Sequence, residues 1–158
     1  MAAVAWISRK PSGANLTSEP LDDFVFFIDR SLGKNTVANH LRAKGVSVRI
    51  HDEHFPPDAP DSTWLASVGR QGWLVLTKDK RIQHRVIEQA AVAAASVRLF
   101  ALSGGNLTGD EMGAVFAKAH RRIINAARAN QPPFIARVYK DGTVAVVMNR
   151  RKLLHRNR

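Results

Sequence analysis

The sequence predicts an α/β fold of three layers, in which a mostly parallel central sheet lies between helices and a C-terminal β-hairpin extends the sheet. Short apolar runs rich in β-branched and aromatic residues alternate with segments of helical periodicity, a pattern typical of strands buried on both faces of a parallel sheet. Near the C-terminus, two strand-like runs instead flank an Asp-Gly pair, which is typical of an antiparallel hairpin. A length of 158 residues fits one domain of this kind.

The strands and the domain limits follow from changes of pattern along the chain. Residues 1–20 contain several Pro, Ser and Asn residues and no sustained period, which predicts an N-terminal arm. The folded unit is expected at 21–148, and a basic tail at 149–158. Four apolar runs predict buried strands, and a later pair of runs predicts the hairpin: 23–29, 46–50, 73–77 and 97–102, then 134–148.

Helical periodicity and its stop signals place four helices between these strands. The first two are expected to end before Gly45 and Gly72, because glycine suits the position that follows a helix end. A third runs through the alanine-rich segment 87–95, and a capping box at 108–111 predicts the start of a long fourth helix. The proline-rich segment 51–60 is expected to be a loop.

Composition excludes several classes of function. The chain has no cysteine, which excludes disulfide frameworks, thiolate nucleophiles and Cys-ligated metal sites. Its 24 Lys and Arg against 13 Asp and Glu give a net charge of +11, so the first partner to expect is a nucleic acid. No apolar run approaches the roughly 20 residues of a membrane span, and no signal-peptide pattern opens the chain. We therefore expect a soluble, cytoplasmic protein without membrane contact.

Acidic residues stand where a parallel sheet would place a site. Asp29 follows the first strand, Asp52 the second and Asp79 the third, while Asp61 opens the helix that leads into the third strand. Ligands of open α/β sheets bind outside the carboxyl ends of the strands, so these acids are expected to converge on one pocket. Clustered carboxylates repel each other unless a cation offsets the repulsion, and oxygen ligands without cysteine favour Mg²⁺ or Mn²⁺.

Each acid also has a structural interpretation that involves no ligand. Asp29 would form an ion pair with Arg30, Asp61 would cap the helix that it opens, and Asp79 would belong to a solvated cluster between two lysines. Trp64 stands at a periodic apolar position and is predicted to be part of the core. The acids are more persuasive as a set than singly.

Four segments in this order carry a family resemblance. They are 26–33 (FFIDRSLG), 48–55 (VRIHDEHF), 61–65 (DSTWL) and 75–82 (VLTKDKRI). Together they resemble the PIN-like ribonucleases, in particular the compact VapC-type toxins, and the similarity extends over about residues 24–148 with the hairpin included. No single segment is as specific as a zinc-finger motif, but their order and spacing agree with this family. The resemblance implies a PIN-like version of the α/β fold predicted above.

The resemblance also implies an activity, a Mg²⁺- or Mn²⁺-dependent endoribonuclease whose metal is held by acids at strand ends. Asp29, Asp61 and Asp79 match the family's catalytic acids. Where many relatives carry a fourth acid shortly after Asp79, this chain has Lys80, Arg81 and Ile82, so either Asp52 substitutes as a ligand or the site holds one ion. RNA is the implied substrate, a small protein antitoxin the implied partner, and self-association is implied as well.

Four basic residues are expected to contact the RNA beside the metal. Positive charge there would attract the phosphate backbone and offset charge on the transferring phosphoryl group. These residues are Arg30, Lys78, Lys80 and Arg81. Their alternative interpretation is an ordinary solvated basic surface.

Two other functions remain open from the sequence. The missing fourth acid and the net charge fit a catalytically degenerate nucleic-acid-binding module, and the carboxylates fit metal-dependent phosphatase chemistry or nuclease chemistry on DNA. The basic tail has two equal interpretations, a poorly ordered terminus or an RNA contact.

Overall fold

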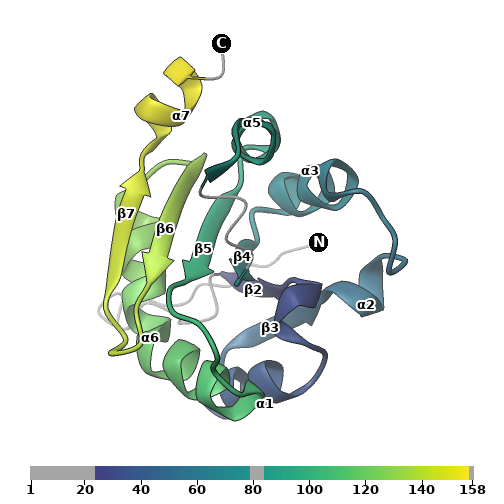
Figure 1. The fold of residues 1–158 in the computed structure, drawn as a ribbon, viewed down its shortest axis with the longest axis vertical. Coiled ribbons are helices and arrows are strands. Elements are labelled where there is room, and N and C mark those ends of the chain that lie inside the picture. The colour runs from purple at the N-terminus through teal and green to yellow at the C-terminus, as the bar shows by residue number, and fades with distance from the viewer. Residues whose placement is uncertain (1–23, 79–83, 157–158) are drawn as a thin grey trace, which may run out of the picture.

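The computed structural model describes residues 24–78 and 84–156, which form one sheet with helices on both faces (Figure 1). The sheet has the strand order β3-β2-β4-β5-β6-β7, and every neighbouring pair is parallel except β6 and β7. The strands are β2 (Val25–Ile28), β3 (Ser47–Ile50), β4 (Leu74–Thr77), β5 (Arg98–Leu102), β6 (Phe134–Val138) and β7 (Val144–Met148). The predicted fold class is confirmed, hairpin included.

The helices divide into two layers. The described helices are η3 (Arg30–Leu32), α1 (Thr36–Arg42), α2 (His51–His54), α3 (Asp61–Gln71), α5 (Val86–Ala95), α6 (Gly109–Ala129) and α7 (Arg150–Arg156). Helices α1 and α6 pack together over one face of the sheet, whereas α5 packs between α3 and α7 over the other (Figure 1). No helix in the described ranges combines the length and the apolar character that a membrane span needs.

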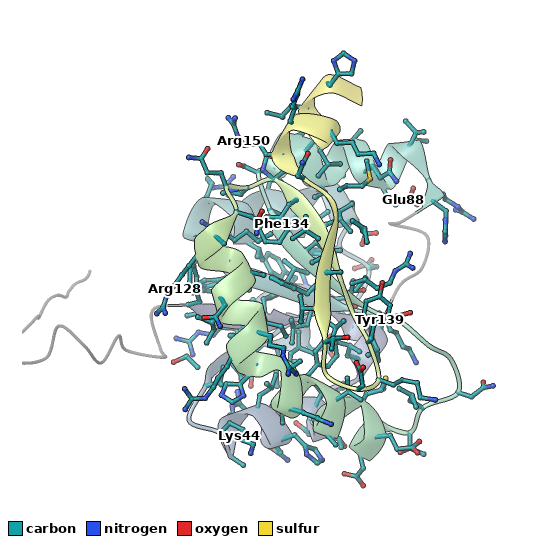
Figure 2. All side chains as sticks on the ribbon, turned by 90° about the vertical axis from the view of Figure 1, so that its left-hand side faces the viewer. Lys44, Glu88, Arg128, Phe134, Tyr139 and Arg150 are labelled. Carbon is teal, nitrogen blue, oxygen red and sulfur yellow. The ribbon has the colours of Figure 1, made fainter. Side chains whose placement is uncertain are left out.

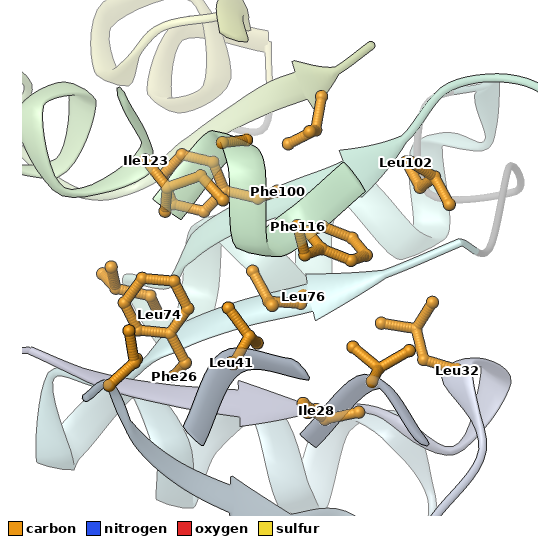
Figure 3. Packing of buried hydrophobic residues seen from close by; sticks show 14 of the residues in the cluster. Phe26, Ile28, Leu32, Leu41, Leu74, Leu76, Phe100, Leu102, Phe116 and Ile123 are labelled. Atoms are coloured by element: carbon orange, nitrogen blue, oxygen red, sulfur yellow. The ribbon is translucent and has the colours of Figure 1, made fainter. Parts of the chain in front are cut away.

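Neighbouring residues of a strand supply two separate cores because successive side chains point to opposite faces. Phe26 is buried in the larger core, which α1 and α6 cover, and Figure 3 shows it with Leu74, Phe100 and Phe116. Phe27, the next residue, belongs to the core under α3 and α5. Both rings are fully buried, which explains why β2 reads as a continuous apolar run rather than as an alternating one.

The predicted ends of two helices are confirmed. Gly72 ends α3 in the left-handed conformation with φ 71°, and a capping box between Thr108 and Glu111 opens α6. Gly69 has a different role, because a Cβ atom there would lie 2.0 Å from the carbonyl oxygen of Ala95. The absence of a side chain at this position lets α3 and α5 approach closely.

Two predicted irregular segments contain helices. Residues His51–His54 form the short helix α2 within the segment expected to be a loop, because the prolines begin only at residue 56. The chain after β7 forms α7, so the interpretation of the tail as a poorly ordered terminus does not hold for Arg150–Arg156. Leu153 explains the difference: its side chain is fully buried in the core under α5. The predicted arm at 1–20 lies outside the described residues.

Candidate active site

The strand order reverses between β2 and β4, and this is where the carboxyl ends leave room for a site. After β2 the chain adds β3 on one side and then returns to place β4 on the other side. The connections on the two sides of such a point leave in opposite directions, so a crevice forms outside the strand ends. Asp29 is the residue directly after β2, and Thr77 is the last residue of β4. The two meet across this crevice.

The Asp29 carboxylate is held by a hydrogen bond on each oxygen. Its Oδ1 accepts the backbone N–H of Ser31 at 2.5 Å, and its Oδ2 accepts the hydroxyl of Thr77 at 2.5 Å. The Ser31 hydroxyl lies 3.2 Å from that of Thr77 and accepts the backbone N–H of Lys78 at 3.1 Å. Asp29 is 7% exposed, so these hydrogen bonds fix the orientation of a nearly buried carboxylate.

Asp29 and Asp61 line the same cavity, which has a volume of about 210 Å³. The wall is built from the residue after β2 and from η3, α2, α3 and α5, and its polar lining includes Asp29, Arg30, Ser31, His51, Asp61 and Glu88. Its apolar lining comes from Pro57, Ala59, Trp64, Leu65 and Ala91. The sequence-based expectation that these two acids face one pocket therefore agrees with their positions.

Asp61 does not cap α3, contrary to its structural interpretation. The N-cap is Pro60, and Asp61 is the first residue of the helix. Its Oδ1 instead accepts the indole N–H of Trp64 at 2.9 Å. Trp64 is 3% exposed and stacks on Phe27 with ring centroids 5.5 Å apart, so the predicted core residue also fixes a pocket carboxylate. A carboxylate in the first turn is further favoured by the helix dipole.

Asp52 is engaged elsewhere and is not among the residues that line the cavity. Its Oδ1 accepts Arg30 Nε at 3.1 Å, and its Oδ2 lies 3.6 Å from Lys34 Nζ. Burial acts to raise the pKa of Asp52, but the charges of Arg30 and Lys34 outweigh it and hold the pKa of that carboxyl below its ordinary value. The ion pair that Arg30 forms thus runs to Asp52, and a second bond from Arg30 to the carbonyl of Pro57, at 3.0 Å, fixes the guanidinium at the rim.

Glu88 on α5 is the pocket acid that the sequence analysis missed. Its side chain is 18% exposed, and its Oε1 lies 3.9 Å from Arg85. Its Oε2 is buried and has no hydrogen-bond partner among the described residues. One signal was available, because Glu88 is the single charged residue in the alanine-rich segment 87–95. The position of Glu88 in the lining of the pocket accounts for a charged residue on this helix.

The remaining predicted site residues are only partly placed. Lys78 is exposed just beyond β4, next to the Ser31 and Thr77 hydroxyls. Asp79, Lys80 and Arg81 lie outside the described residues. Within 24–78 and 84–156, no three His, Asp or Glu side chains are grouped closely enough to hold a metal ion.

The segment that contains this pocket matches a known protein family. Residues 24–104, about half of the chain, match the family described as "PIN like domain". The chain belongs to the PIN-like domain family. The match spans β2 to β5 and includes Asp29, Asp61 and Glu88, so the whole described pocket lies within the PIN-like region.

A curated relative extends the similarity beyond that region. The chain is 29% identical over 125 residues to the Mycobacterium tuberculosis (strain ATCC 25618 / H37Rv) protein named "Putative ribonuclease VapC45". The similarity covers 77% of this chain and 90% of that protein. No solved structure gives a significant match to this chain. The resemblance to the PIN-like family is therefore confirmed.

Proposed function

We propose that this PIN-like protein is an endoribonuclease of the VapC type, which hydrolyses RNA phosphodiester bonds in the pocket of Asp29 and Asp61. The observation that carries the proposal is the Asp29 carboxylate, held by Ser31 and Thr77 at the point where the strand order reverses and sharing a cavity with two further acids. The name of the Mycobacterium tuberculosis relative supports RNA as the substrate. The charge of the chain, +11, supports a polyanion.

The pocket suits a hard divalent cation such as Mg²⁺ or Mn²⁺. The donors are carboxylate oxygens, and the buried Oε2 of Glu88 lacks a hydrogen-bond partner in the described part of the chain. In our proposal Asp29, Asp61 and Asp79 hold the ion, and Glu88 takes the place of the fourth acid that the sequence lacks after Asp79. A bound cation would supply Lewis-acid stabilisation of the charge that develops on the phosphoryl group.

The protein's own groups then have separate tasks. The acids fix the position of the cation, while Arg30, Lys78, Lys80 and Arg81 attract the RNA backbone toward the pocket. Asp52 holds the guanidinium of Arg30 at the rim, and its ion pairs favour this positioning role over a role as a metal ligand. From the VapC-type resemblance we further propose a small protein antitoxin as a partner, self-association and a cytoplasmic location.

A second candidate is a PIN-like module that binds nucleic acid without cutting it. It is favoured by one observation, that the described residues alone do not group three potential ligands closely. The two candidates differ in whether a cation enters the pocket and in whether RNA is cleaved.

A cleavage assay with paired variants separates them. Labelled RNA and DNA of the same sequence are incubated with the protein in Mn²⁺, in Mg²⁺ and in EDTA. We expect RNA cleavage in either metal, none in EDTA, and a loss of roughly 100-fold or more for Asp29→Asn. Asp58→Asn removes the same charge from an exposed residue and serves as the control. Cleavage that persists in EDTA, or that Asp29→Asn leaves unchanged, would exclude the proposed chemistry.

A further inference from the structure

Positive charge is concentrated in the C-terminal part of the chain, from the first turn of α6 onward. Residues 112–158 contain 11 Lys and Arg and one acid, Asp141, which makes +10 of the chain's net +11. Residues 1–111 contain 13 Lys and Arg and 12 acids. The PIN-like region, residues 24–104, holds 11 Lys and Arg against seven acids, so most of the net positive charge belongs to α6, the hairpin and α7.

Helix α7 carries the densest run of these basic residues. It begins with three consecutive basic residues, Arg150, Arg151 and Lys152, and contains no acid. A basic run of this kind gains nothing from its own charges, and contacts with the rest of the fold hold the helix in place. Leu153 provides such a contact through its buried side chain, and Asn149 Oδ1 accepts the backbone N–H of Lys152 at 2.9 Å.

A groove of about 590 Å³ separates α7 from the end of α6. Its lining combines guanidinium groups with amides, from Asn130, Gln131, Asn149, Arg150 and Arg151. Arg150 donates from Nε to the carbonyl of Pro132 at 3.1 Å, which uses one of the five donors of its guanidinium. Arg151 is exposed, as is Lys152 beside the groove. Cations and amides in one groove are suited to phosphate oxygens and base edges.

Helix α7, which lines the groove, lies in the same helical layer as α3 and α5 of the pocket. Helix α5 packs against α3 on one side and against α7 on the other (Figure 1). Glu88 and Ala91 of α5 line the pocket, whereas Val92 shares the core that buries Leu153. Helix α5 thus contributes to the pocket and also packs against α7. Figure 2 also places Glu88 and Arg150 toward one end of the molecule, with Lys44 at the other.

We infer that α7 and the adjoining end of α6 form a second RNA contact, which binds the sugar-phosphate backbone of the strand whose scissile bond lies in the pocket. The inference rests on the proposed function for the identity of that strand, but the binding itself requires no cleavage. An acidic protein segment is the competing occupant. We favour RNA because the positive charge continues from α7 along α6 and the hairpin, which matches an extended polyanion.

The experiment measures RNA binding in EDTA, where the proposed cleavage cannot proceed. A fluorescein-labelled single-stranded RNA of about 20 nucleotides is titrated with the parent chain at several salt concentrations, followed by anisotropy. We expect Arg151→Gln combined with Lys152→Gln to weaken binding roughly tenfold and to reduce the salt slope by about 1.4, which is two phosphate contacts at about 0.7 each. Lys44→Gln combined with Arg49→Gln removes the same charge from exposed positions far from α7 and is expected to change binding little.

A second variant tests the placement of α7 rather than its charge. Leu153→Ala keeps every basic residue but removes the buried anchor, so it is expected to weaken RNA binding as well, while circular dichroism shows that the domain stays folded. Equal weakening by the α7 pair and the control pair would overturn the inference. So would α7-dependent binding of a poly-glutamate peptide with no such dependence for RNA. A parent chain that binds RNA through α7 but never cleaves it in Mn²⁺ would contradict the proposed function alone.

Discussion

The pocket and the α7 surface differ in how they use charge. In the pocket, single charged groups are fixed one by one: Asp29 by Ser31 and Thr77, and Asp61 by Trp64. On α7, cations of one sign accumulate and the exposed ones are held mainly through the helix that carries them. We therefore expect that removal of one charged group from the pocket abolishes most of the cleavage activity. Removal of single basic residues from α7 should instead weaken RNA binding in small steps.

The largest effect is expected at Asp61. Asp61→Asn preserves an oxygen that can accept the Trp64 indole N–H, so the wall of the pocket should stay intact while the charge is lost. We expect RNA cleavage to fall roughly 100-fold and RNA binding in EDTA to change little. Cleavage rates and anisotropy on the same preparations check this, with Asp58→Asn as the control. Cleavage at the parent rate would place the chemistry away from α3.

Substitution of Glu88 should cause a smaller loss of activity than substitution of Asp61, and it should not lower the stability of the fold. Glu88→Gln removes a charge whose buried Oε2 has no hydrogen-bond partner in the described ranges, so without metal the variant should unfold at the same or a higher temperature. We expect cleavage to fall roughly tenfold. Glu53→Gln on the exposed side of α2 is the matched control. A clear drop in melting temperature together with full activity would contradict a pocket role for Glu88.

Gly69 tests whether the pocket depends on the close approach of α3 and α5. Gly69→Ala places a Cβ atom against a backbone carbonyl at 2.0 Å, and backbone gives way less easily than a side chain. We expect a loss of about 1–3 kcal/mol in the free energy of unfolding, measured in urea. Gly113→Ala is the comparison on the opposite face, where the nearest atoms belong to the partly exposed His40 side chain. An equal or larger loss for Gly113→Ala would show that the two helix contacts are equally adaptable.

The smallest expected effect concerns acid stability at Asp52. Because the folded-state pKa of Asp52 is lowered, its ionised form stabilises the fold at pH values above the unfolded pKa of about 3.9, and this stabilisation is lost as the pH falls through the folded-state pKa. The parent chain should therefore exceed Asp52→Asn in stability at pH 6 to 7 by a margin that shrinks below about pH 4. Urea midpoints at several pH values measure it. A stability difference between the parent chain and Asp52→Asn that grows toward low pH would contradict a lowered pKa of Asp52.

The fold was predictable because its signals are local. Apolar runs such as the one before Asp29 leave few alternatives to a doubly buried strand, and Gly72 and the 108–111 capping box set helix ends through backbone chemistry alone. Helix α7 was not predictable in this way. A run of basic residues has no local reason to be ordered, and the burial of Leu153 depends on contacts with α5 that are distant in sequence.

The site was predictable only in part for the same reason. Position after a strand identified Asp29, and the strand order confirms that this position lies at the reversal point. Glu88 was missed because helix periodicity alone does not tell which face of α5 meets the crevice. Asp52 also comes after a strand, but its carboxylate forms ion pairs with Arg30 and Lys34. These contacts join residues that are distant in the sequence, so sequence position alone could not predict them.

The most direct test of the central claim is to locate a cation and a phosphate together. Crystals of the protein with Mn²⁺ and a short RNA carrying a non-hydrolysable linkage would show the ion by anomalous scattering. The account predicts an anomalous peak in the cavity of Asp29, Asp61 and Glu88, with a phosphate of the RNA beside it, and loss of that peak in Asp29→Asn. An ion and phosphate bound only along α7, with the acidic cavity empty in the same crystals, would contradict it.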